Sequence, residues 1–135
     1  MQDMGEAAIK IVAMPSDTNP EGNIFGGWIL SQIDIAGSIV ARTLSPERVV
    51  TISMKEVIFK EPVFVGDLVT CYAKIIRVGN TSIGVLVDVV AQRYNKDTNS
   101  HILKHVTTAE VTYVAVDMLG NKKVIDENVK MAYGF

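Results

Sequence analysis

The feature that most constrains the fold is a stretch of twenty residues, 22–41, in which Asp34 is the only charged side chain. Apolar residues recur along it at helical spacing, which predicts a helix that begins near Gly26. Isoleucines also cover much of the opposite side, so we expect this helix to be buried nearly all round. Ser45 and Pro46 end it, because proline lacks an N–H donor and restricts the residue before it.

The presence of a single carboxylate in this apolar stretch requires an explanation. An ionised group in an apolar helix is expensive to desolvate unless it is paired, hydrogen-bonded or used in chemistry, so Asp34 is the first candidate functional residue. A structural carboxylate bonded across a dimer interface is the alternative. Four glycines, several polar residues and the central Asp34 make insertion into a bilayer costly, so we expect no membrane span.

The rest of the chain is predicted to be strands. Turn formers at 15–23 separate a first short strand, Ile9–Met14, from the helix, and four longer segments rich in β-branched residues follow, at Val49–Phe59, Val69–Val78, Ile83–Tyr94 and Val106–Val116. The short spacers predict antiparallel neighbours. In the third long strand, one face is the expected core face and carries Ile83, Val85, Val87, Val89 and Ala91.

These elements predict an α+β protein with a single hotdog domain, residues 1–135, in which a curved antiparallel sheet wraps a long central helix. The tail at 120–135 could pack on a neighbouring subunit or stay flexible.

Basic residues are scattered and the net charge is −2, so nucleic acid is not an expected partner. A lone Cys71 and the absence of a signal-peptide pattern favour the cytoplasm. His101 and His105 lack accompanying ligands, so we expect no metal site.

One segment has a specific resemblance. The run Asn19-Pro-Glu-Gly-Asn-Ile-Phe-Gly-Gly-Trp28, followed six residues later by Asp34, resembles the active-site segment of hotdog-fold acyl-CoA thioesterases of the YciA type. The likeness continues, in order, through 48–52, 62–67, 78–79 and 112–117. It implies hydrolysis of acyl-CoA to a carboxylate and free CoA, without a further cofactor. It also implies a homodimer with shared sites and a hexamer built as a trimer of dimers.

The residues themselves agree with this chemistry. A helix start offers unpaired N–H groups and the positive end of the helix dipole, and Gly26 and Gly27 let a carbonyl approach the backbone closely. These N–H groups would form an oxyanion hole, and the Gly26 N–H is the first candidate for its hydrogen-bond donor. Asp34 lies about 10 to 12 Å further along the helix axis, so one helix does not easily supply both parts. A two-fold pair of antiparallel helices would bring Asp34 of one subunit beside Gly26 and Asn19 of the other.

The resemblance adds further roles. It implies that Asn19 positions the thioester or the attacking water, and that Ser38 hydrogen-bonds the carboxylate or the water. Asp34 acts either as general base on water or as nucleophile, and both roles need its ionised form. Thiols ionise near a pKa of about 8.5, so a thiolate leaves readily and a general acid is dispensable.

Binding of CoA is expected on the later strands. The resemblance implies that the turn after Val78 contacts the pantetheine and nucleotide, through Arg77, Gly79, Asn80, Thr81 and Ser82. Lys60 is one of several basic residues, with Lys55, Arg93 and Lys104, that could meet the phosphates or be only solvated surface.

Two other functions remain open: a non-catalytic acyl-CoA sensor, and a hotdog dehydratase. The dehydratase would need a histidine paired with a carboxylate near the helix, and neither His101 nor His105 falls there. The acyl chain length is not readable from the sequence.

Overall fold

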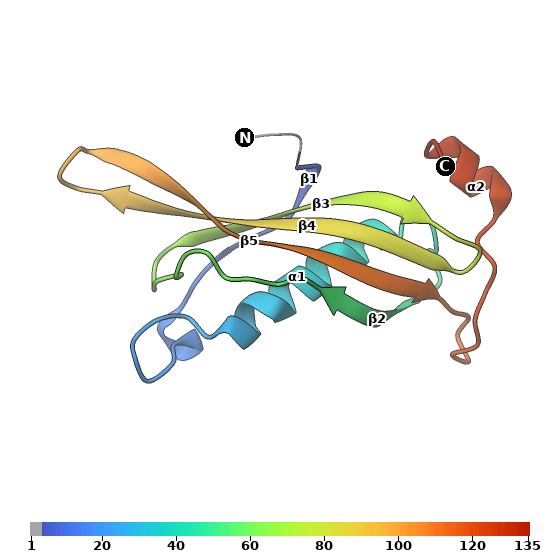
Figure 1. The fold of residues 1–135 in the computed structure, drawn as a ribbon, viewed down its shortest axis with the longest axis horizontal. Coiled ribbons are helices and arrows are strands. Elements are labelled where there is room, and N and C mark those ends of the chain that lie inside the picture. Colours follow the sequence, from blue (N-terminus) through green and yellow to red (C-terminus); the bar gives the residue numbers. More distant parts are fainter. Residues whose placement is uncertain (1–3) are drawn as a thin grey trace.

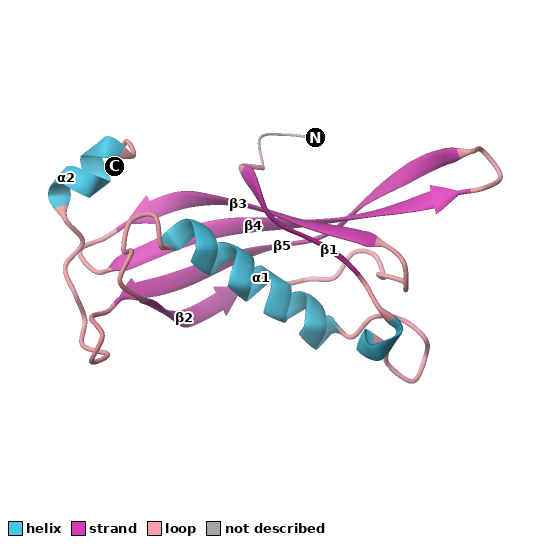
Figure 2. Cartoon of the chain, turned by 180° about the vertical axis from the view of Figure 1, so that it is seen from behind, coloured by secondary structure: helices cyan, strands magenta, loops and turns pink. Residues whose placement is uncertain are grey.

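The computed structural model describes residues 4–135. Its elements, in chain order, are β1 (Glu6–Val12), the short 3-10 helix η1 (Pro15–Asp17), α1 (Gly26–Ala41), β2 (Val49–Lys55), β3 (Leu68–Val78), β4 (Ser82–Asn95), β5 (Ser100–Ala115) and α2 (Glu127–Ala132). The five strands form one antiparallel sheet in the order β1-β3-β4-β5-β2. The long helix α1 lies across one face of this sheet (Figures 1 and 2). This is the predicted hotdog fold.

The core lies between α1 and the sheet. The predicted inner face of β4 is confirmed, because the side chains from Ile83 to Ala91 at alternate positions are fully buried. Ile29, Ile33 and Ala36 of α1 are buried in the same cluster. Apolar burial of this kind stabilises a fold by roughly 25 cal/mol per Å² of surface removed from water.

The prediction that the helix is buried all round is wrong for the single chain. Ile35 is 47% exposed and Ile39 is 45% exposed, because the sheet covers only one side of α1. The strand ends also differ from those predicted. β2 stops at Lys55, since Glu56 takes a left-handed conformation with φ of 57°. β5 begins earlier than predicted, because it pairs with β4 as far out as Asn95 and Ser100.

β2 and β3 are consecutive in the sequence but are not neighbours in the sheet. β2 pairs with β5 at the sheet edge, whereas β3 lies between β1 and β4. The expected antiparallel pairing of consecutive long strands therefore fails for β2 and β3. The connection at 56–67 instead crosses toward the start of α1, where the Ile24 N–H donates to the Val63 carbonyl at 2.9 Å and the Gly66 N–H donates to the Ala13 carbonyl at 2.8 Å. This crossing sets part of the connection against the first turn of α1.

The C-terminal segment folds partly on its own chain. The Ile125 N–H donates to the Asn80 carbonyl at 2.8 Å, and the Ile125 side chain is buried in the core. α2 then follows at the end of the sheet where β3 turns into β4 (Figure 1). Among residues 4–135, no helix is long and apolar enough to cross a membrane.

Candidate active site

The start of α1 presents free hydrogen-bond donors. Phe25 precedes the helix, and its carbonyl accepts the N–H groups of Trp28 and Ile29 at 3.1 and 3.3 Å. The N–H groups of Gly26 and Gly27 have no acceptor within the described residues. Unpaired N–H groups at the positive end of a helix dipole attract a developing negative charge.

Asn19 is held beside these donors. Its side-chain oxygen accepts the N–H groups of Glu21 and Asn23, both at 3.0 Å. The remaining side-chain NH₂ group has no acceptor within the part of the chain that the structure describes, so it is available to a ligand. Asn19 and Gly26 line the same hollow, which has a volume of about 200 Å³. The structure therefore brings these two predicted site residues together.

Asp34 is fixed by two hydroxyl groups from the sheet. The Thr51 hydroxyl donates to Oδ1 of Asp34 at 2.6 Å, and the Tyr113 hydroxyl donates to the Asp34 backbone carbonyl at 2.6 Å. Oδ2 has no hydrogen-bond partner among residues 4–135, and the side chain is half-buried. The carboxylate is thus oriented by one oxygen and has the other free for a reacting molecule.

Tyr113 is suited to this anchoring role. Burial raises the pKa of its hydroxyl, and the nearby negative charge of Asp34 raises the pKa further, so the hydroxyl stays protonated and can donate. Gly37 makes room for it, because a Cβ atom at this position would overlap the Tyr113 hydroxyl oxygen. Thr51 and Tyr113 lie opposite each other in the pairing of β2 with β5. One strand pair therefore delivers both hydroxyl groups to one residue of α1.

The remaining predicted residues of the helix are placed differently. Asp34 does not line the hollow that contains Gly26, and it lies about 12 Å further along α1. The Ser38 hydroxyl donates to the Ile35 carbonyl at 2.7 Å, a common bond for a serine within a helix. The hydrogen bond to the carboxylate comes from Thr51 instead, and a contact between Ser38 and water stays a prediction.

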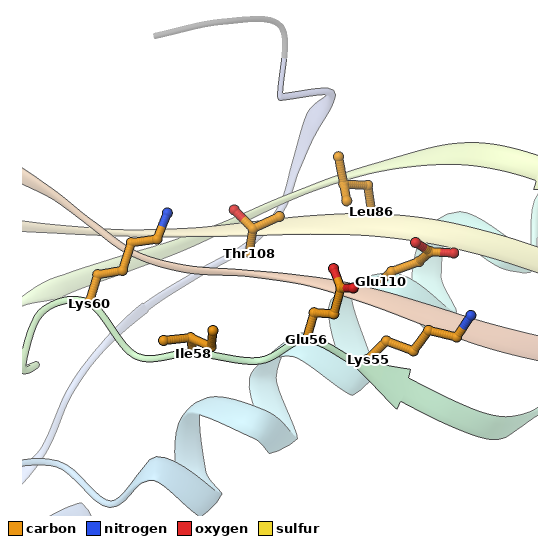
Figure 3. A pocket seen from close by; sticks show the side chains of 7 residues that line it. All are labelled: Lys55, Glu56, Ile58, Lys60, Leu86, Thr108 and Glu110. Carbon is orange, nitrogen blue, oxygen red and sulfur yellow. The ribbon is translucent and has the colours of Figure 1, made fainter.

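The residues predicted to bind CoA fall into two places. Arg77 forms an ion pair with Glu110 on the outer face of the sheet. Glu110 also lines an outer groove of about 180 Å³, which holds Lys55 and Lys60 (Figure 3). The turn at 79–82 lies at the end of the sheet near α2, far from the start of α1 (Figure 1). Within one chain, this turn and the free N–H groups are not brought together.

Sequence reasoning missed Thr51 and Tyr113 as parts of the site. Their segments, 48–52 and 112–117, belong to the resemblance given above. The glycine at position 37, within the helix and three residues after Asp34, was a further signal that something packs closely there. The direction of either side chain is not readable from the sequence. Among the described residues, no cluster of three or more His, Cys, Asp or Glu side chains could hold a metal ion.

A five-stranded antiparallel sheet curved around one long helix defines this chain as a hotdog-fold protein. The family model for the thioesterase superfamily matches residues 21–95. The chain belongs to this superfamily.

Similar proteins agree with this assignment. The acyl-CoA thioester hydrolase YciA of Escherichia coli is 39% identical over 121 residues, which cover 90% of this chain and 91% of the relative. A hexameric hotdog-fold thioesterase of Campylobacter jejuni, Cj0915, is similar in structure with a TM-score of 0.95 and 62% identity, covering 99% of this chain and 100% of that one. HI0827, a hexameric broad-specificity acyl-coenzyme A thioesterase, has a TM-score of 0.84 and 39% identity, covering 96% of this chain and 87% of that one.

Proposed function

We propose that this chain is an acyl-CoA thioester hydrolase that releases free CoA and a carboxylic acid. One observation carries the proposal: α1 holds free N–H donors beside Asn19 at its start, and a carboxylate oriented by Thr51 two turns later. Thioester hydrolysis needs donors where the oxyanion develops and an ionised oxygen to activate or replace the attacking water. The names of the relatives support the same substrate class.

A two-fold homodimer would complete the site. The outward face of α1 exposes Ile35 and Ile39, and no strand among residues 4–135 pairs with the free edge of β2. A second copy covering this face, with its α1 antiparallel, would bring Asp34 of one subunit to Gly26 and Asn19 of the other. The same operation would bring the partner's turn at 79–82 to this end of the helix. The hexamers of the relatives favour a trimer of such dimers.

The proposed reaction uses each group in a definite role. With Asp34 as base, its free oxygen takes a proton from water, the water oxygen attacks the thioester carbon, and the Gly26 and Gly27 N–H groups donate to the resulting oxyanion. Collapse of this intermediate breaks the C–S bond and releases the CoA thiolate. With Asp34 as nucleophile, its oxygen attacks the thioester carbon, the C–S bond breaks to release the CoA thiolate, and water then cleaves the resulting mixed anhydride. One oxyanion-hole donor contributes roughly 3 to 4 kcal/mol to catalysis.

The CoA moiety is proposed to meet Arg77 and Lys60 on the outer face and the turn residues Gly79 to Ser82 at the sheet end. CoA is then part of substrate and product, and no other cofactor takes part. We also propose that residues 1–135 form one catalytic domain, that 120–135 contributes to contacts with a neighbouring subunit, and that the enzyme works in the cytoplasm.

The test is steady-state release of CoA from acyl-CoA substrates, comparing the wild type with Asp34→Asn. We expect turnover to fall by about 10³-fold or more in the variant, with unchanged assembly size by light scattering. The second candidate function is acyl-CoA sensing, because the same hollow and donors would bind a thioester without cleaving it. Binding of acyl-CoA by a wild type that releases no thiol would establish sensing in place of hydrolysis.

A further inference from the structure

Phe59 lies against the start of α1. A Cβ atom placed on Gly26 would lie 3.2 Å from Cε2 and 3.4 Å from Cζ of the Phe59 ring, so the ring sits where any larger residue at 26 would project. Phe59 and Gly26 also line the same hollow of about 200 Å³, in which Phe59 is the largest side chain. The ring is therefore a wall of the space next to the free N–H groups.

One side of this hollow is apolar and formed by core residues, whereas Asn19, Asn23 and Glu61 also line it. Three of the residues that line it are almost fully buried, namely Ile24, Ile29 and Val63. The pantetheine arm must continue outward to its nucleotide, so these buried apolar side chains suit the acyl group instead. An apolar cavity of about 150 Å³ holds a benzene molecule, so a hollow of about 200 Å³ has room for an acyl group of about six carbons.

The backbone on both sides of Phe59 is hydrogen-bonded, whereas its ring is partly exposed. The Lys60 N–H donates to the Val106 carbonyl at 2.8 Å, and the Thr107 hydroxyl donates to the Ile58 carbonyl at 2.7 Å. Phe59 is 43% exposed, and an aromatic ring forms no such bonds. Displacing the ring would need rotation about its side-chain bonds only, with the hydrogen-bonded main chain in place, so a longer acyl group would have one wall to displace.

We propose that Phe59 is a specificity-determining residue whose ring limits the length of the acyl chain accepted beside Gly26. The inference rests on the proposed hydrolysis and adds the length of acyl chain that the site accepts. Replacing the ring by a smaller side chain then opens the hollow to longer chains, and leaves the groups that act on the thioester in place.

The experiment measures kcat/KM over an acyl-CoA series from acetyl to palmitoyl for the wild type, Phe59→Leu and Phe59→Ala. Ile58→Ala is the matched control, because Ile58 is the adjacent residue but lines the outer groove instead. We expect the ratio of dodecanoyl to butyryl kcat/KM to rise roughly tenfold or more in Phe59→Ala, less in Phe59→Leu, and to stay at the wild-type value in Ile58→Ala.

Two results would overturn the proposal: an equal change for every chain length, which would place the ring against the common pantetheine arm, or no change at all. Thermal unfolding of each variant accompanies the kinetics, and Phe59→Leu keeps the test decisive if Phe59→Ala does not fold. A wild type without thiol release would refute the proposed hydrolysis alone. The affinities of the same acyl-CoA series, compared between the wild type and Phe59→Leu, would then decide the role of Phe59.

Discussion

The Thr51 hydroxyl on β2 donates a hydrogen bond of 2.6 Å to Oδ1 of Asp34 on α1, across 17 residues of sequence. This bond leaves only one carboxylate oxygen of Asp34 open to a substrate or water. It also ties the catalytic candidate on the helix to an edge strand of the sheet.

Removing this donor is expected to impair turnover more than binding. In Thr51→Val the carboxylate loses its orienting bond, and hydrogen bonds to charged groups contribute about 1.5 to 3 kcal/mol, so kcat should fall by roughly 10- to 100-fold with little change in KM. Thr51→Ser keeps the hydroxyl and should retain most of the activity. Equal activity in Thr51→Val and the wild type would show that the bond has no part in turnover.

Sites shared between subunits predict complementation. Asp34→Asn and Asn19→Ala should each be nearly inactive alone, because every site in either homodimer lacks one group. After the two variants are unfolded together and refolded, half of the dimers are mixed, and each mixed dimer has one intact site. Activity on the order of a quarter of the wild-type value should therefore return. A mixture as inactive as its components would refute the shared site.

The two roles of Asp34 make different isotope predictions. In a single turnover in H₂¹⁸O, with enzyme in excess over acyl-CoA, a general base directs ¹⁸O from water into the carboxylic acid product. A nucleophile gives the product an unlabelled oxygen from Asp34 if water attacks the anhydride at the aspartyl carbon, and the label then stays in the protein. Mass spectrometry of the product and of the peptide containing Asp34 measures both positions.

Gly37 should not tolerate a side chain. A methyl group at this position overlaps the Tyr113 hydroxyl, so Gly37→Ala should lower the free energy of unfolding by about 1 to 3 kcal/mol, as overpacking of a core does. Gly27→Ala is the control for stability, since a Cβ atom there meets nothing within 4 Å. In the double variant with Tyr113→Phe, part of the loss should be recovered. Thermal unfolding at one fixed protein concentration measures each effect.

Cys71 should make the protein less stable in alkali. Burial raises the pKa of its thiol from 9.0 to about 12. Between these values the unfolded chain ionises first and holds fewer protons than the folded one, so stability is complete below pH 9 and declines as pH rises toward 12, by at most about 1.4 kcal/mol per pH unit. Urea unfolding from pH 8 to 11 should show a shallower decline in Cys71→Ala. Parallel slopes in both proteins would contradict the prediction.

Local patterns in the sequence were sufficient for the helix and most of the strands. In α1 and β4, the spacing of apolar residues along the chain shows which face of the element is buried. This spacing can be read from a short stretch of sequence. Asp34 and Gly26 were candidates from local pattern alone, because a single charge in an apolar helix and a glycine pair at a helix start are unusual, whereas Asn19 became a candidate only through the family resemblance. β2 ends at Lys55 because Glu56 takes a left-handed backbone conformation. The periodicity of apolar residues does not predict that conformation.

Short-range spacing of apolar and polar side chains was enough to predict the class of fold, the buried face of β4 and the residues of α1 on which the chemistry is proposed to depend. The pairing of β2 with β5, which brings Thr51 and Tyr113 to Asp34, is visible only in the folded chain. The same is true of the connection at 56–67, which places Phe59 against Gly26. These contacts join positions far apart in the chain. Their geometry depends on how the curved sheet closes on the helix, and side-chain packing decides that.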